Sequence, residues 1–313
     1  MKLIAAFLKL VRLPNLFFIV LTQVLFHQAV VQPVLEPLGI DPAIDGWSFI
    51  MLVVASLLIA AAGYVINDYF DINIDQVNKP MGNVVDNLVS RRWAMAWHFV
   101  LSGIGIVLSA YVAWVTGFWY ILFGNFICVL LLFGYSASLK RKLLSGNVLI
   151  SLLTAWVILI ICFAEIKIGT MIQPGMAEAS NKITRIGVLY AAFAFISSLI
   201  REAIKDIEDM KGDEKYGCRT MPIVWGVNAA KVYIAVWLTV MIASLVILLL
   251  YVFRFGWWWA VVYAVVFIIF PFVLIFLQLF KAQSTQQYHR LSQLTKLVML
   301  SGILSMIFFY FYL

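Results

Sequence analysis

Residues 51–75 read MLVVASLLIAAAGYVINDYFDINID, an uncharged apolar run that ends in three aspartates. The first sixteen of these residues carry no charge, and Asp68, Asp71 and Asp75 then follow within eight residues. A helix needs about 20 apolar residues to cross the hydrocarbon core of a membrane. The stretch therefore predicts a membrane-spanning helix with an acidic end.

The whole chain has the composition of an integral membrane protein. Of its 313 residues, 64% are hydrophobic and 12% are charged, whereas soluble domains carry roughly 25% charged residues. Repeated runs of spanning length predict an all-α, multi-span transmembrane bundle that forms a single domain over residues 1–313. The nine expected spans are 16–33, 47–66, 94–116, 119–135, 148–165, 186–200, 231–251, 257–280 and 295–313. The sixth looks short, so its polar end is expected to continue as helix out of the membrane.

Basic residues indicate how this bundle is oriented, because Lys and Arg accumulate on the cytoplasmic side. With the N-terminus in the cytoplasm and the C-terminus on the opposite side, 18 of the 22 Lys and Arg residues fall on the cytoplasmic face. Only Lys167, Lys182, Arg185 and Arg254 fall on the other face. We therefore expect a multi-pass protein of the cell's inner membrane. The net charge of +7 mostly reflects this bias, so nucleic acid is not an expected partner.

A second acidic stretch, REAIKDIEDMKGDEKYG at residues 201–217, repeats the spacing of the first. Two residues separate Asp206 from Asp209, and three separate Asp209 from Asp213, as in the first triplet. At about 100° per residue, positions i, i+3 and i+7 share one narrow face of a helix. Both triplets end a predicted span on the cytoplasmic side, so they can face each other across the bundle. A helix break at Gly212 would move Asp213 off that face.

Two facing clusters of carboxylates require a cation, because like charges beside a low-dielectric bundle repel one another strongly. Oxygen ligands alone suit Mg²⁺, which keeps several waters and bridges one or two carboxylates to substrate phosphates. The two clusters are suited to hold two Mg²⁺ on one diphosphate. The candidate metal ligands are Asp68, Asp71, Asp75, Asp206, Asp209 and Asp213. The alternative, that these residues cap helices or pair with local basic residues, is common for one isolated aspartate but does not account for two copies at one spacing.

Three motifs resemble those of the UbiA superfamily of intramembrane prenyltransferases. Asn67 and the first aspartate triplet match N-D-x-x-D-x-x-x-D, and the second triplet matches D-x-x-D-x-x-x-D. The stretch YSASLKRKLLSGN at residues 135–147 is similar to the family's Y-S-x-x-L-K-R segment after the fourth helix. Helices 1–4 carry the first motif and helices 5–8 the second, so the spans form two loosely similar halves plus a ninth helix. The resemblance implies Mg²⁺-dependent transfer of a prenyl group from a prenyl diphosphate to a lipophilic acceptor beside membrane lipid, with Asn67 and the six aspartates as catalytic residues.

The resemblance also suggests which other side chains contact the substrates. The diphosphate contacts expected are Tyr135, Lys140, Arg141, Lys205 and Lys79, and the acceptor contacts expected are Asn15 and Arg12. Lys79 is a candidate because Gly82 and Asn83 stand where many members have an Arg-Pro pair. The simpler alternatives are positive-inside bias for Lys140 and Arg141, an interfacial tyrosine at position 135, a local ion pair for Lys205, and a helix cap for Asn15.

The identity of the acceptor is the least determined feature. Both acidic stretches look most like the branch that includes digeranylgeranylglyceryl phosphate synthases, which implies geranylgeranylglyceryl phosphate as acceptor. An aromatic quinone precursor is the alternative within the same enzyme class. An ion-coupled transporter is the alternative of another class, although its site would lie near the membrane midplane and these carboxylates lie at one face. The polar segments 67–93 and 201–230 are expected to form a cytoplasmic cap over the diphosphate.

Overall fold

The computed structural model describes residues 7–78, 85, 89–166 and 175–312. Within these residues, nine helical segments are long and apolar enough to cross a membrane. They are Leu13–Leu38, Gly46–Asn78, Arg91–Thr116, Trp119–Ala137, Ser145–Glu165, Met176–Lys215, Val227–Phe253, Trp258–Leu279 and Thr285–Tyr312. The expected all-α bundle of about nine spans is confirmed, and the chain is an integral, multi-pass membrane protein.

Six spans are single helices and three are interrupted. The single helices are α4 (Gly46–Asn78), α5 (Arg91–Thr116), α6 (Trp119–Ala137), α7 (Ser145–Glu165), α8 (Met176–Lys215) and α10 (Val227–Phe253). The first span comprises α2 (Leu13–Leu25), η1 (Phe26–Val31), α3 (Gln32–Leu35) and η2 (Glu36–Leu38). The eighth span comprises α11 (Trp258–Ala264), η5 (Val265–Ile269) and α12 (Phe270–Leu279). The ninth span comprises α13 (Thr285–Leu304) and α14 (Ile307–Tyr312). A π-helical turn precedes Pro33 in the first span and Pro271 in the eighth. Proline removes a backbone donor and crowds the preceding turn, which accounts for both interruptions.

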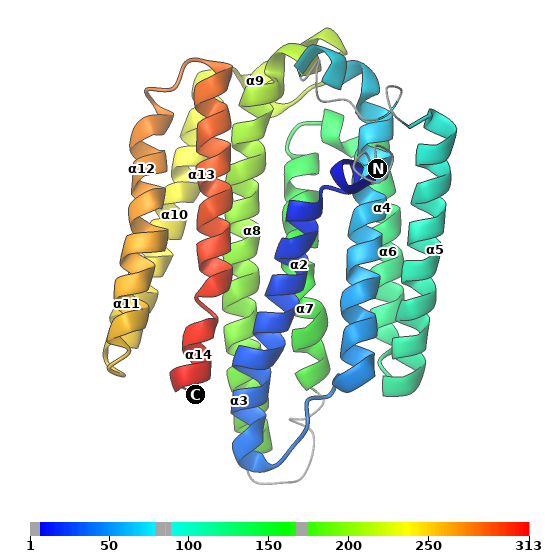
Figure 1. The fold of residues 1–313 in the computed structure, drawn as a ribbon. Helices are drawn as coiled ribbons and strands as arrows, with labels where there is room; N and C mark the ends of the chain where they lie inside the picture. The colour runs from blue at the N-terminus through cyan, green and yellow to red at the C-terminus, as the bar shows by residue number, and fades with distance from the viewer. Residues whose placement is uncertain (1–6, 79–84, 86–88, 167–174, 313) are drawn as a thin grey trace.

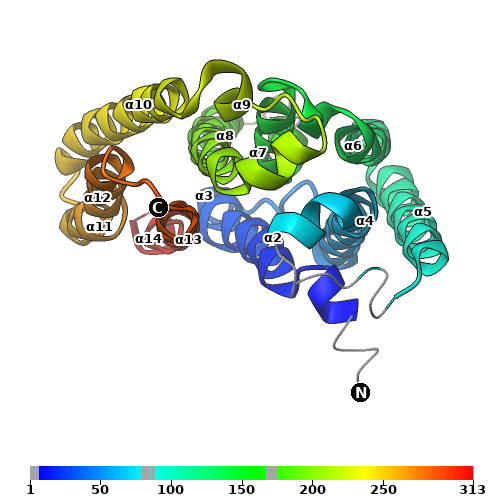
Figure 2. The same ribbon diagram turned by 90° about the horizontal axis from the view of Figure 1, so that it is seen from above.

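The spans run side by side, and the two acidic motifs lie at one end of the bundle (Figure 1). This end, at which α4 reaches Asn78 and α8 reaches Lys215, is called the motif end below. It also carries the N-terminus, whereas the C-terminus lies at the opposite end. Seen along the spans, α2, α4, α7 and α8 surround the middle of the molecule, with α5 and α6 on one flank and α10 to α13 on the other (Figure 2).

Two helices extend well past the apolar runs that mark their spans, and the expected continuation of the sixth span as helix is confirmed. The span expected over 47–66 belongs to α4, which continues to Asn78, and the span expected over 186–200 belongs to the forty-residue α8. Gly212 does not break α8, so both acidic motifs lie entirely on continuous helix. A count of apolar residues stops where polar side chains face a cavity or a neighbouring helix instead of lipid. The length of each helix is therefore greater than the count of apolar residues alone indicates.

The segments expected to be cytoplasmic connections accordingly begin as helix. Residues 67–78 form the last turns of α4, and residues 201–215 form the last turns of α8. A short helix, α9 (Met221–Trp225), then leads into α10. The helical part of each segment gives its carboxylates a fixed position that a loop would not provide.

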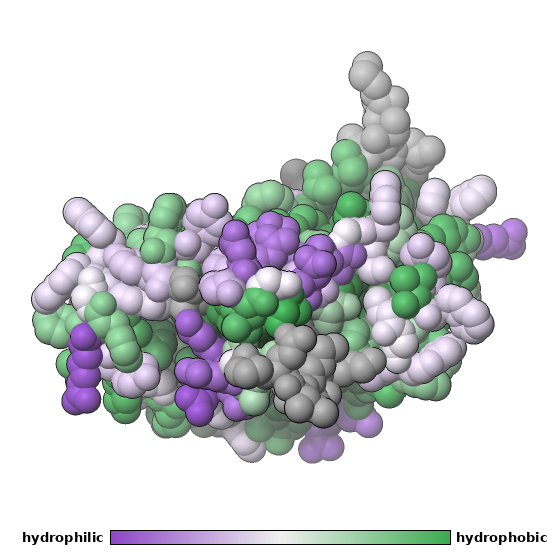
Figure 3. All heavy atoms as spheres, turned by 90° about the horizontal axis from the view of Figure 1, so that it is seen from below, coloured by the Kyte–Doolittle hydropathy of each residue, from purple (hydrophilic) through white to green (hydrophobic). Residues whose placement is uncertain are grey.

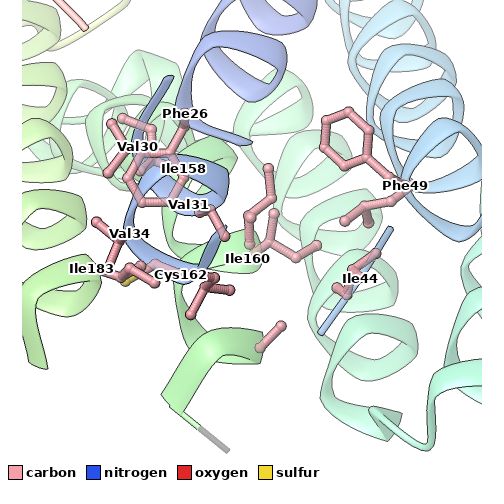
Figure 4. Packing of buried hydrophobic residues seen from close by; sticks show 14 of the residues in the cluster. Phe26, Val30, Val31, Val34, Ile44, Phe49, Ile158, Ile160, Cys162 and Ile183 are labelled. Carbon is pink, nitrogen blue, oxygen red and sulfur yellow. The ribbon is translucent and has the colours of Figure 1, made fainter. Parts of the chain in front are cut away.

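A buried apolar cluster stabilises the end of the bundle away from the motifs (Figure 4). Phe26 of the first span packs there with Cys162 of α7 and Ile183 of α8. Since lipid tails are as apolar as these side chains, close packing rather than burial from water holds membrane helices together. A Cβ on Gly187 would lie 2.6 Å from the Cys162 Sγ, so glycine permits the close approach of α8 to α7. Seen from this end, a group of hydrophilic side chains lies near the middle of the face, with others at its edges, among hydrophobic and intermediate ones (Figure 3).

Candidate active site

The helices around the middle of the bundle enclose a cavity of about 360 Å³. Its lining changes along α4 and α8, from carboxylates at the motif end to apolar side chains deeper in the bundle. On α4 the lining runs from Asn78 down to Ser56, and on α8 it runs from Asp213 down to Tyr190. The cavity therefore suits a molecule with a charged head and an apolar tail.

Five of the six motif aspartates line this cavity. They are Asp71 and Asp75 from α4, and Asp206, Asp209 and Asp213 from α8. Asp68 is not among the lining residues, and its Oδ1 accepts a hydrogen bond from Arg12 Nη2 at 2.7 Å. Burial alone would lower the pKa of Arg12, but the Asp68 carboxylate reverses the effect and the pKa is raised. In the first triplet, Asp68 thus forms an ion pair beside the start of α2, whereas Asp71 and Asp75 line the cavity.

Lys140 projects from the short helix η3 (Leu139–Arg141) and meets the first motif. Its Nζ lies 2.6 Å from Asp71 Oδ1 and 3.2 Å from Asn67 Oδ1. The Asn67 amide in turn donates to Asp71 Oδ2 at 2.9 Å, so the three side chains form a closed arrangement. Burial lowers the pKa of Lys140, and Asp71 offsets this only in part. The Lys140 side chain is only 10% exposed and is held by a motif carboxylate, whereas Lys142 is exposed. The positive-inside bias alone therefore does not account for the placement of Lys140.

The second motif is held by different partners. Asn147, at the start of α7, donates to Asp206 Oδ2 at 2.9 Å. Lys205 lines the cavity, but its ion-pair partner is Glu202, at 3.9 Å, and not the neighbouring Asp206. Glu202 also lies 2.8 Å from Arg201 Nη1. A carboxylate one helical turn before the motif is therefore shared by Arg201 and Lys205.

Asn78 joins the ends of the two motif helices. Its Nδ2 donates to the Asp209 carbonyl at 2.9 Å, and its Oδ1 accepts from the Gly212 amide at 2.9 Å. A Cβ on Gly212 would lie 2.5 Å from the Asn78 amide, so a side chain there would displace this contact. The contact fixes the distance between the two sets of carboxylates.

The model of the UbiA prenyltransferase family matches residues 37–311. The chain belongs to this family. Similar relatives include the digeranylgeranylglyceryl phosphate synthases of Methanosphaera stadtmanae, 29% identical over 78% of this chain and 81% of the relative, and of Hyperthermus butylicus, 31% identical over 74% and 70%. The UbiA membership shows that the chain is a prenyltransferase, which decides against the transport alternative.

Solved structures share the fold of this UbiA protein. One, described as giving insights into the biosynthesis of digeranylgeranylglyceryl phosphate synthase in membranes, has a TM-score of 0.62 at 22% identity and covers 98% of this chain and 99% of its own. A UbiA homolog from Archaeoglobus fulgidus bound to GPP and Mg²⁺ has a TM-score of 0.55 at 15% identity and covers 96% and 99%. The helical arrangement around the cavity is therefore that of UbiA proteins.

Most of the other substrate contacts expected from the sequence lie at the cavity of this UbiA protein. Tyr135, Arg141, Arg12 and Asn15 all line it. The Nε of Arg141 is buried without a hydrogen-bond partner in the described part of the chain, so it can donate to a bound group. Lys79, like Gly82 and Asn83, lies outside the described residues.

Several residues at the site were not assigned a role from the sequence. They are Asn78, Asn147, Glu202 and Lys296. Asn78 stands three residues after Asp75, on the same helical face, and Asn147 ends the third motif, so spacing could have indicated both. Lys296 carries no such signal, because it is a lone lysine counted with the cytoplasmic charges.

The oxygen donors fit a divalent cation that shares its ligands with a phosphate. Among the described residues, no three Asp, Glu, His or Cys side chains are placed to hold a metal ion unaided. Mg²⁺ does not need such a cage, since one or two carboxylates, waters and substrate phosphates complete its shell. Asp71 and Asp75 on one wall, with Asp209 and Asp213 on the other, provide this arrangement. The residues present therefore fit Mg²⁺ that is bound together with a diphosphate.

Proposed function

We propose that this UbiA enzyme transfers a geranylgeranyl group from its diphosphate to the glycerol hydroxyl of geranylgeranylglyceryl phosphate, with two Mg²⁺ between the acidic motifs. The observation that carries the proposal is the single cavity that joins five motif carboxylates to a deep apolar lining. Relatives named digeranylgeranylglyceryl phosphate synthase, at about 30% identity, support the choice of acceptor. The solved UbiA homologs bound to GPP or DMAPP with Mg²⁺ support the choice of donor and metal.

The residues at the motif end hold the diphosphate. Bound Mg²⁺ supplies positive charge that stabilises the leaving diphosphate. The Lys140 ammonium and the unpartnered Arg141 Nε are further donors already fixed at the cavity wall. Charges that are in place before the reaction stabilise developing negative charge without reorganisation. The proposal assigns metal binding to the aspartates and diphosphate binding to these two cations, with Lys205, and Lys79 outside the described residues, as additional contacts.

The apolar part of the cavity holds the prenyl tail and protects the reactive carbon. The C1–oxygen bond of the prenyl diphosphate breaks, the glycerol oxygen bonds to C1, and the hydroxyl proton and the diphosphate leave. Tyr135 lines the cavity beside the motifs, and an aromatic ring face stabilises a nearby cation. Exclusion of water keeps the allylic cation for the acceptor.

Water exclusion is assigned to the segments 67–93 and 201–230, parts of which extend beyond the helices described above. Residues 79–84 and 86–88 of the first segment lie outside the described residues. We expect limited trypsin cleavage within both segments to slow when Mg²⁺ and a prenyl diphosphate are added together. Unchanged cleavage would count against a cap.

A transfer assay tests the proposed reaction. Purified protein in lipid receives Mg²⁺ and radiolabelled geranylgeranyl diphosphate, with geranylgeranylglyceryl phosphate and aromatic quinone precursors offered in parallel. The expected result is label on the glycerol lipid alone, lost on chelation of Mg²⁺ and reduced at least about 100-fold by Asp71→Ala or Asp209→Ala, because each removes a fixed charge at the reacting group.

Glu214→Ala is the matched control, since Glu214 is an exposed carboxylate on the same helix as Asp209. Its activity should equal that of the unmodified enzyme. Label found only on an aromatic ring would show that the acceptor is a quinone precursor. Transfer that survives both aspartate substitutions would refute the role of the acidic motifs.

A further inference from the structure

The cavity contains a lysine that no carboxylate of the described residues balances. Lys296 belongs to α13, lies within the ninth span and lines the cavity. Its Nζ donates to the Asn15 Oδ1 at 2.6 Å and lies 5.3 Å from the centre of the Phe18 ring. Both partners are uncharged, and no described acidic side chain forms an ion pair with it. Ionisable side chains within membrane spans are costly and mark functional sites, usually with an opposite charge as partner.

The charged groups around Lys296 add to its positive field. Arg12 and Arg201 are the charged side chains that act on it, and both are cationic. Arg12 is paired with Asp68, and Arg201 shares Glu202 with Lys205, so the Lys296 charge is not balanced by a described carboxylate on this wall. The Nε of Arg201 is buried without a partner in the described residues, and Arg201 lines the cavity too. The wall therefore offers an excess cation and an open donor to an anion.

Lys296 lies apart from Lys140, the main cation assigned to the diphosphate, although Arg201 shares Glu202 with Lys205. Lys140 comes from η3, between α6 and α7, and its charge is directed to Asp71. Lys296 comes from α13, on the far side of α8 and α2 (Figure 2). One cavity thus presents two cationic positions: Lys140 is paired with the motif carboxylate Asp71, whereas Lys296 is paired with the neutral Asn15.

We propose that Lys296, together with Arg201 and Asn15, binds the phosphate of an anionic glycerol-lipid acceptor in a subsite separate from the diphosphate. This assignment rests on the proposed function, since it names how that reaction selects its acceptor. A neutral aromatic acceptor would leave the Lys296 charge without a partner inside the bundle. The ninth span, which lies outside the two similar halves expected from the sequence, then supplies the acceptor specificity.

Kinetics with two acceptors test the subsite. Geranylgeranylglyceryl phosphate and its phosphate-free counterpart, geranylgeranylglycerol, are compared in the wild type, Lys296→Met and Lys296→Arg. Loss of a charged contact predicts a KM for the phosphorylated acceptor about 10- to 100-fold higher in Lys296→Met. The KM for geranylgeranyl diphosphate should change less than about twofold, since its charge is held elsewhere. Lys296→Arg should keep most of the affinity, and Lys296→Met should lose the preference for the phosphorylated acceptor.

Lys281→Met is the matched control, because Lys281 is an exposed lysine in the turn between α12 and α13. It should leave every constant unchanged. An equal rise in both KM values for Lys296→Met would show that Lys296 serves the diphosphate, and unchanged constants would show that it only joins α13 to α2. Either result would overturn the proposal.

A measurement on the wild type keeps the test independent of folding. Decyl phosphate, but not decanol, should inhibit competitively against the acceptor and not against geranylgeranyl diphosphate. Competition against the diphosphate would overturn the subsite. If the wild type transfers nothing to a glycerol lipid, the proposed function fails. In that case, calorimetry measures the affinity of decyl phosphate for the wild type and for Lys296→Met, which tests the anion site without the reaction. Equal affinities of the two proteins would refute the anion site.

Discussion

Lys140 is held at the cavity wall by two side chains of the first motif. Its ammonium is neutralised by Asp71 and steadied by Asn67. A bound diphosphate with Mg²⁺ would draw Asp71 to the metal and leave the ammonium to the phosphate oxygens. Because the lysine is already buried at the cavity wall, little of its conformational freedom is lost on binding.

Substitution of Lys140 by methionine tests this role. We expect kcat/KM for the prenyl diphosphate to fall about 100- to 1,000-fold, as for the loss of one fixed donor at a developing charge. Lys142→Met is the control, since Lys142 is two residues away and exposed. Steady-state kinetics of both variants check the prediction. If the two variants lose activity equally, the charge of the whole segment matters and not the placement of Lys140.

Residues that belong to a repeated sequence motif could be predicted from the sequence, whereas contacts between residues far apart in the chain could not. The repeated spacing predicted both aspartate triplets, and five of these six side chains line the cavity. The pairing of Asp68 with Arg12 joins residues 56 positions apart, so it depends on how α2 packs against α4. The contact between Asn15 and Lys296 spans 281 positions and depends on the closure of the whole bundle.

At the scale of helices, the important property is the extension of α4 and α8 beyond their apolar runs. Hydropathy placed both helices correctly and ended α4 early, whereas the polar end of the sixth span was expected to continue as helix and does so in α8. The last turns of both helices face carboxylates and amides instead of lipid. The extension places both motifs on rigid backbone. The contact of Asn78 with Gly212 and the Asp209 carbonyl then holds the two helix ends together.

Asn78→Ala tests whether this contact sets the spacing of the carboxylates. It removes two hydrogen bonds, so we expect a stability loss of about 1–3 kcal/mol. We also expect the apparent affinity for Mg²⁺ to weaken, because the two sets of ligands are no longer held at one distance. Thermal unfolding and Mg²⁺ titration of the transfer rate measure both effects. Asn73→Ala, at an exposed position of the same helix, should change neither, and an unchanged Mg²⁺ dependence in Asn78→Ala would reject the coupling.

At the scale of the whole molecule, the two termini lie at opposite ends of the bundle (Figure 1), and most basic residues of the described chain belong to parts of the elements near the motif end. Lys140, Lys142 and Lys281 lie at or near the motif end, whereas Arg254 follows α10 at the other. Since Lys and Arg accumulate on the cytoplasmic side, we propose that the motif end faces the cytoplasm. A charged diphosphate would then reach the site without crossing the membrane.

Cysteine labelling in intact cells tests this orientation. Cys128, Cys162 and Cys218 are buried free thiols, so background reaction with a membrane-impermeant maleimide should be low. A cysteine in place of the exposed Arg254 should react in intact cells, whereas one in place of the exposed Lys142 should react only after the membrane is permeabilised. The reverse pattern would place the acidic motifs outside the cytoplasm. In that case the excess of basic residues at the motif end would reflect anion binding alone.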